Sequence, residues 1–263
     1  MRTALTIAGS DSGGGAGIQA DLKTFAAAGV YGTSAITAVT AQNTRGVTAW
    51  EPVSTDLVIA QIEAVASDLP PDAVKTGMLA TAAIVEAVAA TIKALDLPNL
   101  VVDPVMVAKG GDRLLREDAV NAIRVHLLHL AEVVTPNVPE AEVLSGITIA
   151  TVADMREAGR RILQLGPRVV VVKGGHLEAT GSEVIDVVCG RHENFEITGP
   201  RIDTVHTHGT GCTFASATAA QLALGEPVEA AVRWARAYLE GAIRNAPGLG
   251  GGHGPLNHFW RVY

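Results

Sequence analysis

Residues 208–212, H-G-T-G-C, combine two features that could carry chemistry. An apolar helical pattern follows them, so unpaired backbone N–H groups and the positive end of a helix dipole would be available there to an anion. Cys212 lies in the same turn, where that field would lower the pKa of its thiol. An anion site beside a titratable thiol suits phosphoryl transfer. An ordinary helix cap, with Cys212 as a small buried side chain, is the alternative, and the local sequence leaves both open.

Other apolar runs also end in polar or charged residues. Asn137 and Glu140 follow the run at 133–135, and their oxygens could hold hydrated Mg²⁺ beside phosphates, although this pattern also suits the first turn of a helix. Lys173 follows four consecutive valines and precedes two glycines, so it could contact a phosphate or extend into solvent. Asp103 ends a further run. Several strand ends therefore carry residues that suit phosphate binding.

The glycine-rich loop at 9–17 would allow the backbone to approach a ligand closely. Gly15, Gly17 and Ala20 fit a dinucleotide-binding pattern only loosely. The acidic residue expected about 20 positions later is missing, which leaves a nicotinamide-dependent dehydrogenase as a remote alternative. The chain has neither a Walker A loop nor the H-R-D and D-F-G motifs of protein kinases, so a nucleoside triphosphate would have to be held by another device.

The elements that must position these residues alternate along the chain, with short apolar runs between longer alanine-rich helical patterns. Strands are expected at 4–8, 33–39, 73–76, 100–103, 133–135 and 168–173. Helices are expected at 16–28, 56–67, 82–95, 118–130, 152–165, 212–224 and 229–243. Residues 183–188 and 194–197 indicate an antiparallel hairpin that extends the sheet, and the glycine-rich segment 247–255 is typical of a mobile loop.

This order of elements predicts an α/β fold with a doubly wound, mostly parallel central sheet flanked by helices. The four valines at 169–172 indicate a strand covered on both faces. Ligands bind such a sheet at the carboxyl ends of its strands, which is where the polar residues above are expected to gather. At 263 residues, the chain suits a single domain spanning 1–263.

Composition excludes several classes of protein. The net charge is −7 and the basic residues are scattered, which argues against a general nucleic-acid binder. The amino-terminal residues lack the long apolar region of a signal peptide, and no run approaches the length of a membrane span. Two cysteines form neither a disulfide framework nor a metal-binding spacing, so we expect a reducing compartment and a cytoplasmic protein without a membrane partner.

Taken in order, these segments resemble the ribokinase-like superfamily of small-molecule kinases, and within it the hydroxymethylpyrimidine/phosphomethylpyrimidine kinase family of thiamine biosynthesis. The resemblance covers essentially the whole chain, and the ordered set of motifs carries it. These motifs are AGSDS at 8–12, GGAGIQAD at 14–21, TAQNT at 40–44, KTGML at 75–79, DPVM at 103–106, TPNVPE at 135–140, KGGH at 173–176, HGTGCT at 208–213 and GPLNHF at 254–259.

The resemblance implies that ATP phosphorylates the hydroxymethyl group of 4-amino-5-hydroxymethyl-2-methylpyrimidine, and then phosphorylates the resulting monophosphate to the pyrophosphate. It implies backbone donors at Gly209, Thr210 and Gly211 that stabilise the charge of the transferred phosphoryl group. Cys212 matches the general-base position, where most of the superfamily carries Asp and the pyrimidine kinase branch carries Cys. Its thiol would need a pKa below the usual value to act near neutral pH.

The same resemblance implies a substrate pocket. Gln42 matches the glutamine that binds the pyrimidine, and its amide offers one donor and one acceptor to a ring nitrogen and an exocyclic amino group. Asp21, Met78 and Val105 would complete the pocket, and Gly9 would let the ring approach the backbone.

ATP and Mg²⁺ are the cofactors that the resemblance implies. Asn137 and Glu140 would organise the metal, with Glu140 and Asp103 as its carboxylate ligands. Lys173 would contact the ATP phosphates and take part in catalysis, with Thr207 nearby. A homodimer is also implied.

Two alternatives of function remain at this point. A pyridoxal or pyridoxine kinase of the same fold would bind a pyridine with a phenolic hydroxyl, which Gln42 favours less than an aminopyrimidine. A non-catalytic pyrimidine-binding sensor would keep the ring pocket, but the residues suited to phosphoryl transfer argue against it.

The charged segment 109–113, with its glycines, is expected to form a flap that excludes water.

Overall fold

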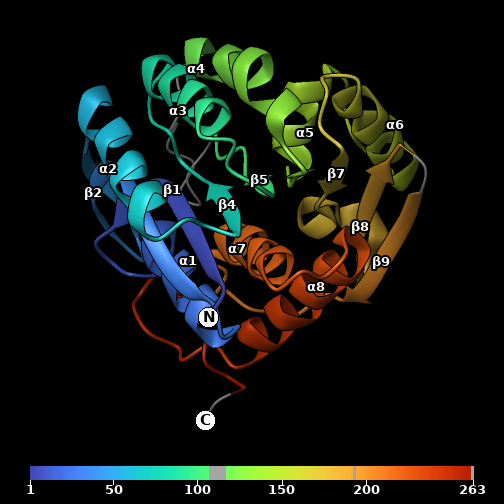
Figure 1. Ribbon diagram of the computed structural model, residues 1–263. Coiled ribbons are helices and arrows are strands. Elements are labelled where there is room, and N and C mark those ends of the chain that lie inside the picture. The colour runs from blue at the N-terminus through green and yellow to red at the C-terminus, as the bar shows by residue number, and fades with distance from the viewer. Residues whose placement is uncertain (107–116, 192–193, 262–263) are drawn as a thin grey trace.

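A single mixed sheet runs through the molecule (Figure 1). The computed structural model describes residues 1–106, 117–191 and 194–261. The strands are β1 Thr3–Asp11, β2 Tyr31–Asn43, β3 Gly46–Pro52, β4 Ala73–Thr76, β5 Leu100–Val102, β6 Val133–Val134, β7 Val169–Val172, β8 Glu183–Gly190 and β9 Asn194–Pro200. The helices are α1 Gly17–Ala27, α2 Thr55–Asp68, α3 Ala82–Ala94, α4 Glu117–Ala122, α5 Val138–Ser145, α6 Val152–Leu163, α7 Thr210–Ala223 and α8 Val228–Arg244.

Among the described residues, the sheet has nine strands, in the order β3-β2-β1-β4-β5-β6-β7-β8-β9. Strands β2, β1, β4, β5, β6 and β7 pair in parallel, whereas β3, β8 and β9 add antiparallel pairs at the two edges. The predicted fold class is therefore confirmed. A single domain over 1–263 stays a prediction, which the continuous sheet supports.

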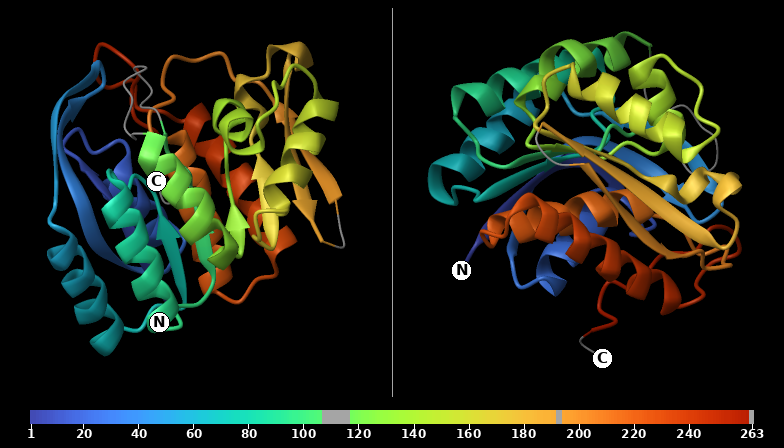
Figure 2. Two further views of the ribbon diagram at one scale, coloured as in Figure 1. Left: turned by 90° about the horizontal axis from the view of Figure 1, so that it is seen from above. Right: turned by 90° about the vertical axis from the view of Figure 1, so that its right-hand side faces the viewer.

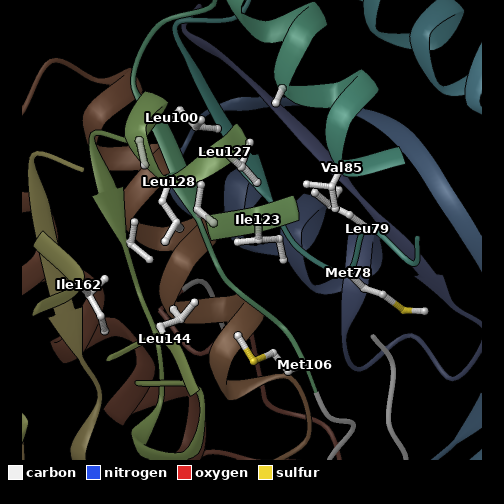
Figure 3. Packing of buried hydrophobic residues seen from close by; sticks show 14 of the residues in the cluster. Met78, Leu79, Val85, Leu100, Met106, Ile123, Leu127, Leu128, Leu144 and Ile162 are labelled. Carbon is white, nitrogen blue, oxygen red and sulfur yellow. The ribbon is translucent and has the colours of Figure 1, made fainter. Parts of the chain in front are cut away.

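Helices cover both faces of the sheet (Figure 2). Alternate residues of a strand point to opposite faces, so Leu5 and Ile7 join the core under α2 to α6, while Ala4 joins the core under α1, α7 and α8. Figure 3 shows the first core, in which Leu100, Ile123 and Leu127 are among the labelled side chains. No helix among the described residues is long and apolar enough to span a membrane.

Three local differences from the predicted elements have physical reasons. Strand β3 was not predicted because its side chains are largely exposed at an edge, and it contains no apolar run. Helix α5 was expected only as the alternative of a helix start at Asn137 and Glu140, because its two turns are too short for a clear periodic pattern. The predicted helix at 118–130 is not a regular α-helix throughout. Helix α4 is followed by a wider π turn, Ile123–Leu127, and then by a tighter 3₁₀ turn, Leu128–Leu130, so that the consecutive Leu127 and Leu128 are both buried.

Candidate active site

A cavity of about 820 Å³ opens at the carboxyl ends of the parallel strands and at the start of α7. Every residue predicted for the site lines this cavity except Asp21. The lining residues from the prediction are Gly9, Gln42, Met78, Asp103, Val105, Asn137, Glu140, Lys173, Thr207, Gly209, Thr210, Gly211 and Cys212. Their roles toward ligands stay predictions. The predicted flap at 109–113 lies outside the described residues.

Helix α7 runs through the core and presents its first turn, Thr210–Cys212, at the cavity. Nearly all of its residues are buried, and most are Ala, Ser or Thr, so neighbouring backbones can approach closely. Gly209 precedes the helix with a left-handed φ of 83°, and a Cβ there would lie 1.9 Å from the carbonyl oxygen of Gly15. Only glycine fits this position. The first N–H groups of α7, which have no acceptor within the helix, therefore lie at the cavity wall.

Cys212 is the third residue of α7 and borders the cavity. Burial raises the pKa of its thiol from 9.0 to about 11, although the nearby Lys75 charge opposes the rise. This direction is opposite to the lowered pKa expected from the helix terminus alone. Asp21 and Asp103 add to the rise because a thiolate would repel their carboxylates. The thiol is therefore held protonated near neutral pH.

Asp103, Glu140 and Lys173 form a buried charged group at the centre of the sheet edge. Lys173 Nζ donates to Asp103 Oδ1 at 3.0 Å. Burial alone would lower the pKa of Lys173, but the two carboxylates raise it above its ordinary value. Burial raises the pKa of Glu140 to about 7, and Asp103 adds to this, whereas Lys173 opposes it. A Cβ on Gly211 would lie 3.4 Å from both Asp103 Oδ2 and Lys173 Nζ, so this group adjoins the first turn of α7.

The two carboxylates fit a magnesium ion of the kind that nucleotides bring with them. Among the described residues, no cluster of three or more His, Cys, Asp or Glu side chains could hold a metal by itself. Mg²⁺ often uses only one or two carboxylates, with waters and phosphates completing its octahedron. Burial is the main cause of the raised pKa of Glu140, and Lys173 is the positive charge beside the two carboxylates; a cation bound there would stabilise their charged forms further.

Asn137 has a structural task at this position. Its side-chain oxygen accepts from the Glu140 N–H at 2.9 Å, and Glu140 Oε2 accepts from the Asn137 N–H at 2.8 Å. This capping box begins α5 and fixes the orientation of Glu140. The alternative that Asn137 and Glu140 begin a helix is therefore correct. It is compatible with Glu140 as a metal ligand, because only Oε2 of Glu140 takes part in the capping box.

Gly9, Gln42, Met78 and Val105 also line the cavity and combine apolar surface with one amide; they are called the ring slot below. A Cβ on Gly9 would lie 3.3 Å from the sulfur of Met78, so a larger residue would narrow the ring slot. Gln42 Nε2 lies 3.4 Å from His208 Nε2. An amide at the edge of an apolar slot can orient a flat heterocycle.

The loop at 9–17 is shaped by a single carboxylate. Asp11 accepts hydrogen bonds from the N–H groups of Gly13, Gly15 and Ala16, and from His208 Nε2 at 2.8 Å. Burial alone would raise the pKa of Asp11, but His208 and the backbone donors hold it below its ordinary value. Asp11 thus ties the first glycine-rich loop to the residue before Gly209.

Asp21 is the predicted site residue that the structure places elsewhere. Its carboxylate is fully buried and accepts from Lys75 Nζ at 2.8 and 3.0 Å, from Thr6 Oγ1 at 2.6 Å and from Ser216 Oγ at 2.5 Å. It is not part of the cavity wall, so the prediction that it contacts the substrate is not supported. Sequence reasoning gave no role to Lys75, which does border the cavity. A charged residue inside the short strand 73–76 was the available signal.

Further cavity residues were also missed. Asp186 and Arg236 form a buried ion pair at 3.2 Å, and the Gly174 N–H donates to Asp186 at 2.8 Å. Arg201 donates to the carbonyl oxygens of Gly175 and Leu177 at 2.9 and 2.7 Å, which fixes the turn after Lys173. These residues come from β8, α8 and the segment after β9, so the sequence around each one carried no signal of a shared site.

Known proteins match this chain over nearly its whole length. A family model described as phosphomethylpyrimidine kinase matches residues 11–257. A hydroxymethylpyrimidine/phosphomethylpyrimidine kinase of Bacillus subtilis is 49% identical over 256 residues, which cover 97% of this chain and 94% of the relative. The structure of Bacillus subtilis pyridoxal kinase in an ADP complex has a TM-score of 0.91 and 41% identity, and 100% of each chain is covered. That of phosphomethylpyrimidine kinase from Clostridium difficile 630 has a TM-score of 0.82 and 45% identity, with 92% of this chain and 100% of the other covered.

The family assignment follows from the extent of these matches and from where the cavity lies within them. The family model spans far more than half of the chain, and relatives near 50% identity span almost all of it. The cavity residues that suit phosphoryl transfer lie inside the matched region. The chain therefore belongs to the phosphomethylpyrimidine kinase family.

Proposed function

We propose that this protein transfers the γ-phosphoryl group of ATP, with Mg²⁺, to the hydroxymethyl group of 4-amino-5-hydroxymethyl-2-methylpyrimidine, and then to the monophosphate so formed. The observation that carries the proposal is the arrangement of one cavity. The ring slot with Gln42 and the start of α7 at Gly209–Cys212 line the same space, and Lys173 lies beside the start of α7. A flat heterocycle held in the ring slot would present its alcohol to the start of α7, which would bind the transferred phosphoryl group.

Different parts of the cavity would bind the ring and the transferred phosphoryl group. The slot formed by Gly9, Met78 and Val105 would hold the ring, while the Gln42 amide would bind its polar edge. The backbone donors of Gly209, Thr210 and Gly211 would stabilise the equatorial oxygens of the transferred group. They are held rigidly by a buried helix, so they need not reorganise during the transfer.

Lys173 and the carboxylates would manage the charge of the nucleotide. When bound, Mg²⁺ would neutralise phosphate charge and orient the phosphates. Glu140 and Asp103 would hold the ion, and the capping box at Asn137 would keep Glu140 in place. Lys173, which already pairs with Asp103, would be free to exchange part of that contact for a phosphate oxygen. Thr207 would lie near the phosphates at the cavity wall.

Cys212 would accept the proton of the attacking alcohol. Its thiol starts protonated, because burial raises its pKa to about 11, so only a small thiolate fraction is present near neutral pH. That thiolate is a correspondingly strong base. Alcohol attack on phosphorus requires little proton transfer before the transition state, which makes such a base helpful without making it indispensable.

Product analysis tests the function directly. Purified protein is incubated with the pyrimidine alcohol, ATP and Mg²⁺, and the products are separated by anion-exchange chromatography. The monophosphate should form first and the pyrophosphate second, each with one equivalent of ADP. Pyrimidine binding by calorimetry without ADP formation would instead identify a non-catalytic sensor.

A pyridoxal kinase is the second candidate, favoured by the likeness to the Bacillus subtilis pyridoxal kinase structure at 41% identity. The Gln42 amide at the ring end favours an aminopyrimidine, which matches both a donor and an acceptor. Comparing kcat/KM for the two alcohols decides between them, and a preference for pyridoxal would overturn the pyrimidine assignment. The homodimer and the cytoplasmic location stay predictions, of which light scattering on the purified chain checks the first.

A further inference from the structure

A buried ion pair lies behind the cavity wall and has no part in the steps described above. Lys75 Nζ donates to both carboxylate oxygens of Asp21, and neither side chain is exposed to solvent. Thr6 and Ser216 donate to the same carboxylate from β1 and α7. Lys75 is among the residues that line the cavity and Asp21 is not, so the ammonium is the end of the pair nearer to the cavity, although neither side chain is exposed.

The positive end lies between the ring slot and the thiol. Ser216, which donates to Asp21, follows Cys212 by one turn of α7, so the two side chains share a face of the helix. On the other side, a Cβ on Gly77 would lie 2.8 Å from Lys75 Nζ, and the next residue, Met78, lines the ring slot. A group attached to a ring in the slot would therefore approach the Lys75 ammonium and the Cys212 thiol together.

The two acceptors of the proposed reaction make different demands on these groups. In the first transfer, the alcohol oxygen forms a bond to the γ-phosphorus, the bond to the bridging oxygen breaks, and its electron pair leaves with ADP. The alcohol proton must also leave, so a base assists. In the second transfer, the acceptor oxygen belongs to a phosphomonoester whose second pKa is about 6. At about pH 7.5 it has no proton left to lose, and the obstacle is repulsion between two phosphate groups.

We propose, on the basis of the function proposed above, that Cys212 assists only the transfer to the hydroxymethyl group, whereas Lys75 assists mainly the transfer to the monophosphate. The monophosphate replaces the hydroxyl beside Cys212 and brings about two negative charges close to Lys75. A fixed positive charge in a wall that excludes water counters the repulsion between the acceptor and ATP more strongly than a solvated cation could.

Kinetics on each acceptor separately test the part of the proposal that concerns Cys212. Cys212→Ser and wild type are compared with the alcohol alone and with the monophosphate alone, at about pH 7.5. We expect kcat/KM for the alcohol to fall about 100-fold and that for the monophosphate to fall less than about threefold. Equal losses for both acceptors would overturn the proposal. A wild-type protein that converts neither acceptor would contradict the proposed function instead.

The double variant Asp21→Asn/Lys75→Met tests the part that concerns Lys75. It removes both charges while keeping one amide oxygen as an acceptor in place of the carboxylate, and it should slow the second transfer at least about tenfold more than the first. The matched control is Lys93→Met, which removes an exposed lysine of α3 and should change neither transfer. Equal slowing of both transfers by the double variant would overturn the role of Lys75.

A second variant keeps the test valid if the double variant does not fold. Lys75→Arg retains a positive charge beside Asp21, so the ratio of the two transfer rates should stay within about twofold of wild type even if both rates fall. A folded Lys75→Arg protein that loses the first transfer more than the second would contradict the proposal.

Discussion

Replacing Asp21 with Asn should destabilise the fold much more than it weakens pyrimidine binding. The Asp21 carboxylate lies 2.8 and 3.0 Å from the Lys75 ammonium, and both side chains are fully shielded from solvent. Asn keeps the shape and one acceptor oxygen, but it leaves the ammonium as an uncompensated buried charge. Removing one partner of a buried ion pair costs about 3–5 kcal/mol. That is a large part of the roughly 5–15 kcal/mol by which a folded domain is stable.

Urea unfolding followed by circular dichroism measures this effect. Asp21→Asn should shift the midpoint to lower urea at an unchanged m-value, and it should lower Tm by roughly 6–20 °C. Combining it with Lys75→Met should recover most of the loss, because a neutral pair needs no compensating charge. A stability change below about 0.5 kcal/mol, together with a raised KM for the pyrimidine, would refute this reasoning and make Asp21 a substrate ligand.

The pH dependence of stability provides a second check with a defined sign. Burial alone would lower the pKa of Lys75, but Asp21 raises it above the ordinary value. In wild type, the stabilisation from Lys75 is therefore fully present below about pH 10.4 and is lost only above it. In Asp21→Asn, burial lowers the folded-state pKa of Lys75 below that value by up to about 3–5 units. The unfolded chain then binds more protons, so the stability of the variant should rise between roughly pH 7 and 10.

Three further outcomes can be measured directly. Because the pKa of Cys212 is about 11, kcat/KM for the alcohol at saturating ATP should rise about tenfold per pH unit from pH 7 to pH 10, and a plateau below pH 8 would show that another group is the base. Gln42→Leu should weaken pyrimidine binding about 10–100-fold in calorimetry with little change in kcat; unchanged affinity would remove the amide contact. Asn137→Ala should cost about 0.5–2 kcal/mol in urea unfolding, since it removes the cap of α5, and a neutral change would contradict the importance of the capping box.

Much of the fold follows from local patterns. Buried strands such as Leu100–Val102 and Val169–Val172 are recognisable because both of their faces are covered and their residues are apolar. Strand β3 escapes recognition since it is an exposed edge, held by pairing with β2 and not by an apolar face of its own. The widened turn at Ile123–Leu127 also depends on the core that it fits, which local periodicity does not describe.

Some residues of the candidate site could likewise be predicted from local sequence, and others could not. Residues at strand ends and helix starts, such as Glu140 and Lys173, could be placed at one edge because a parallel sheet brings its carboxyl ends together. Asp186, Arg201 and Arg236 could not, because they reach the cavity from the antiparallel edge and from a later helix. Nothing in the residues next to them indicates that destination.

By itself, the sequence determined the alternation of strands and helices, the edge at which polar residues gather, and the glycine-bounded start of α7, since each depends on chain-local chemistry and a general rule of parallel sheets. Only the tertiary structure decided what Asp21 contacts and in which direction the pKa of Cys212 shifts. Asp21 faces Lys75, 54 positions away, and not the cavity. The pKa of Cys212 rises although a helix terminus would lower it. The physical reason is that ion pairing and protonation depend on excluded water and on distant charges, which meet only when the chain has folded.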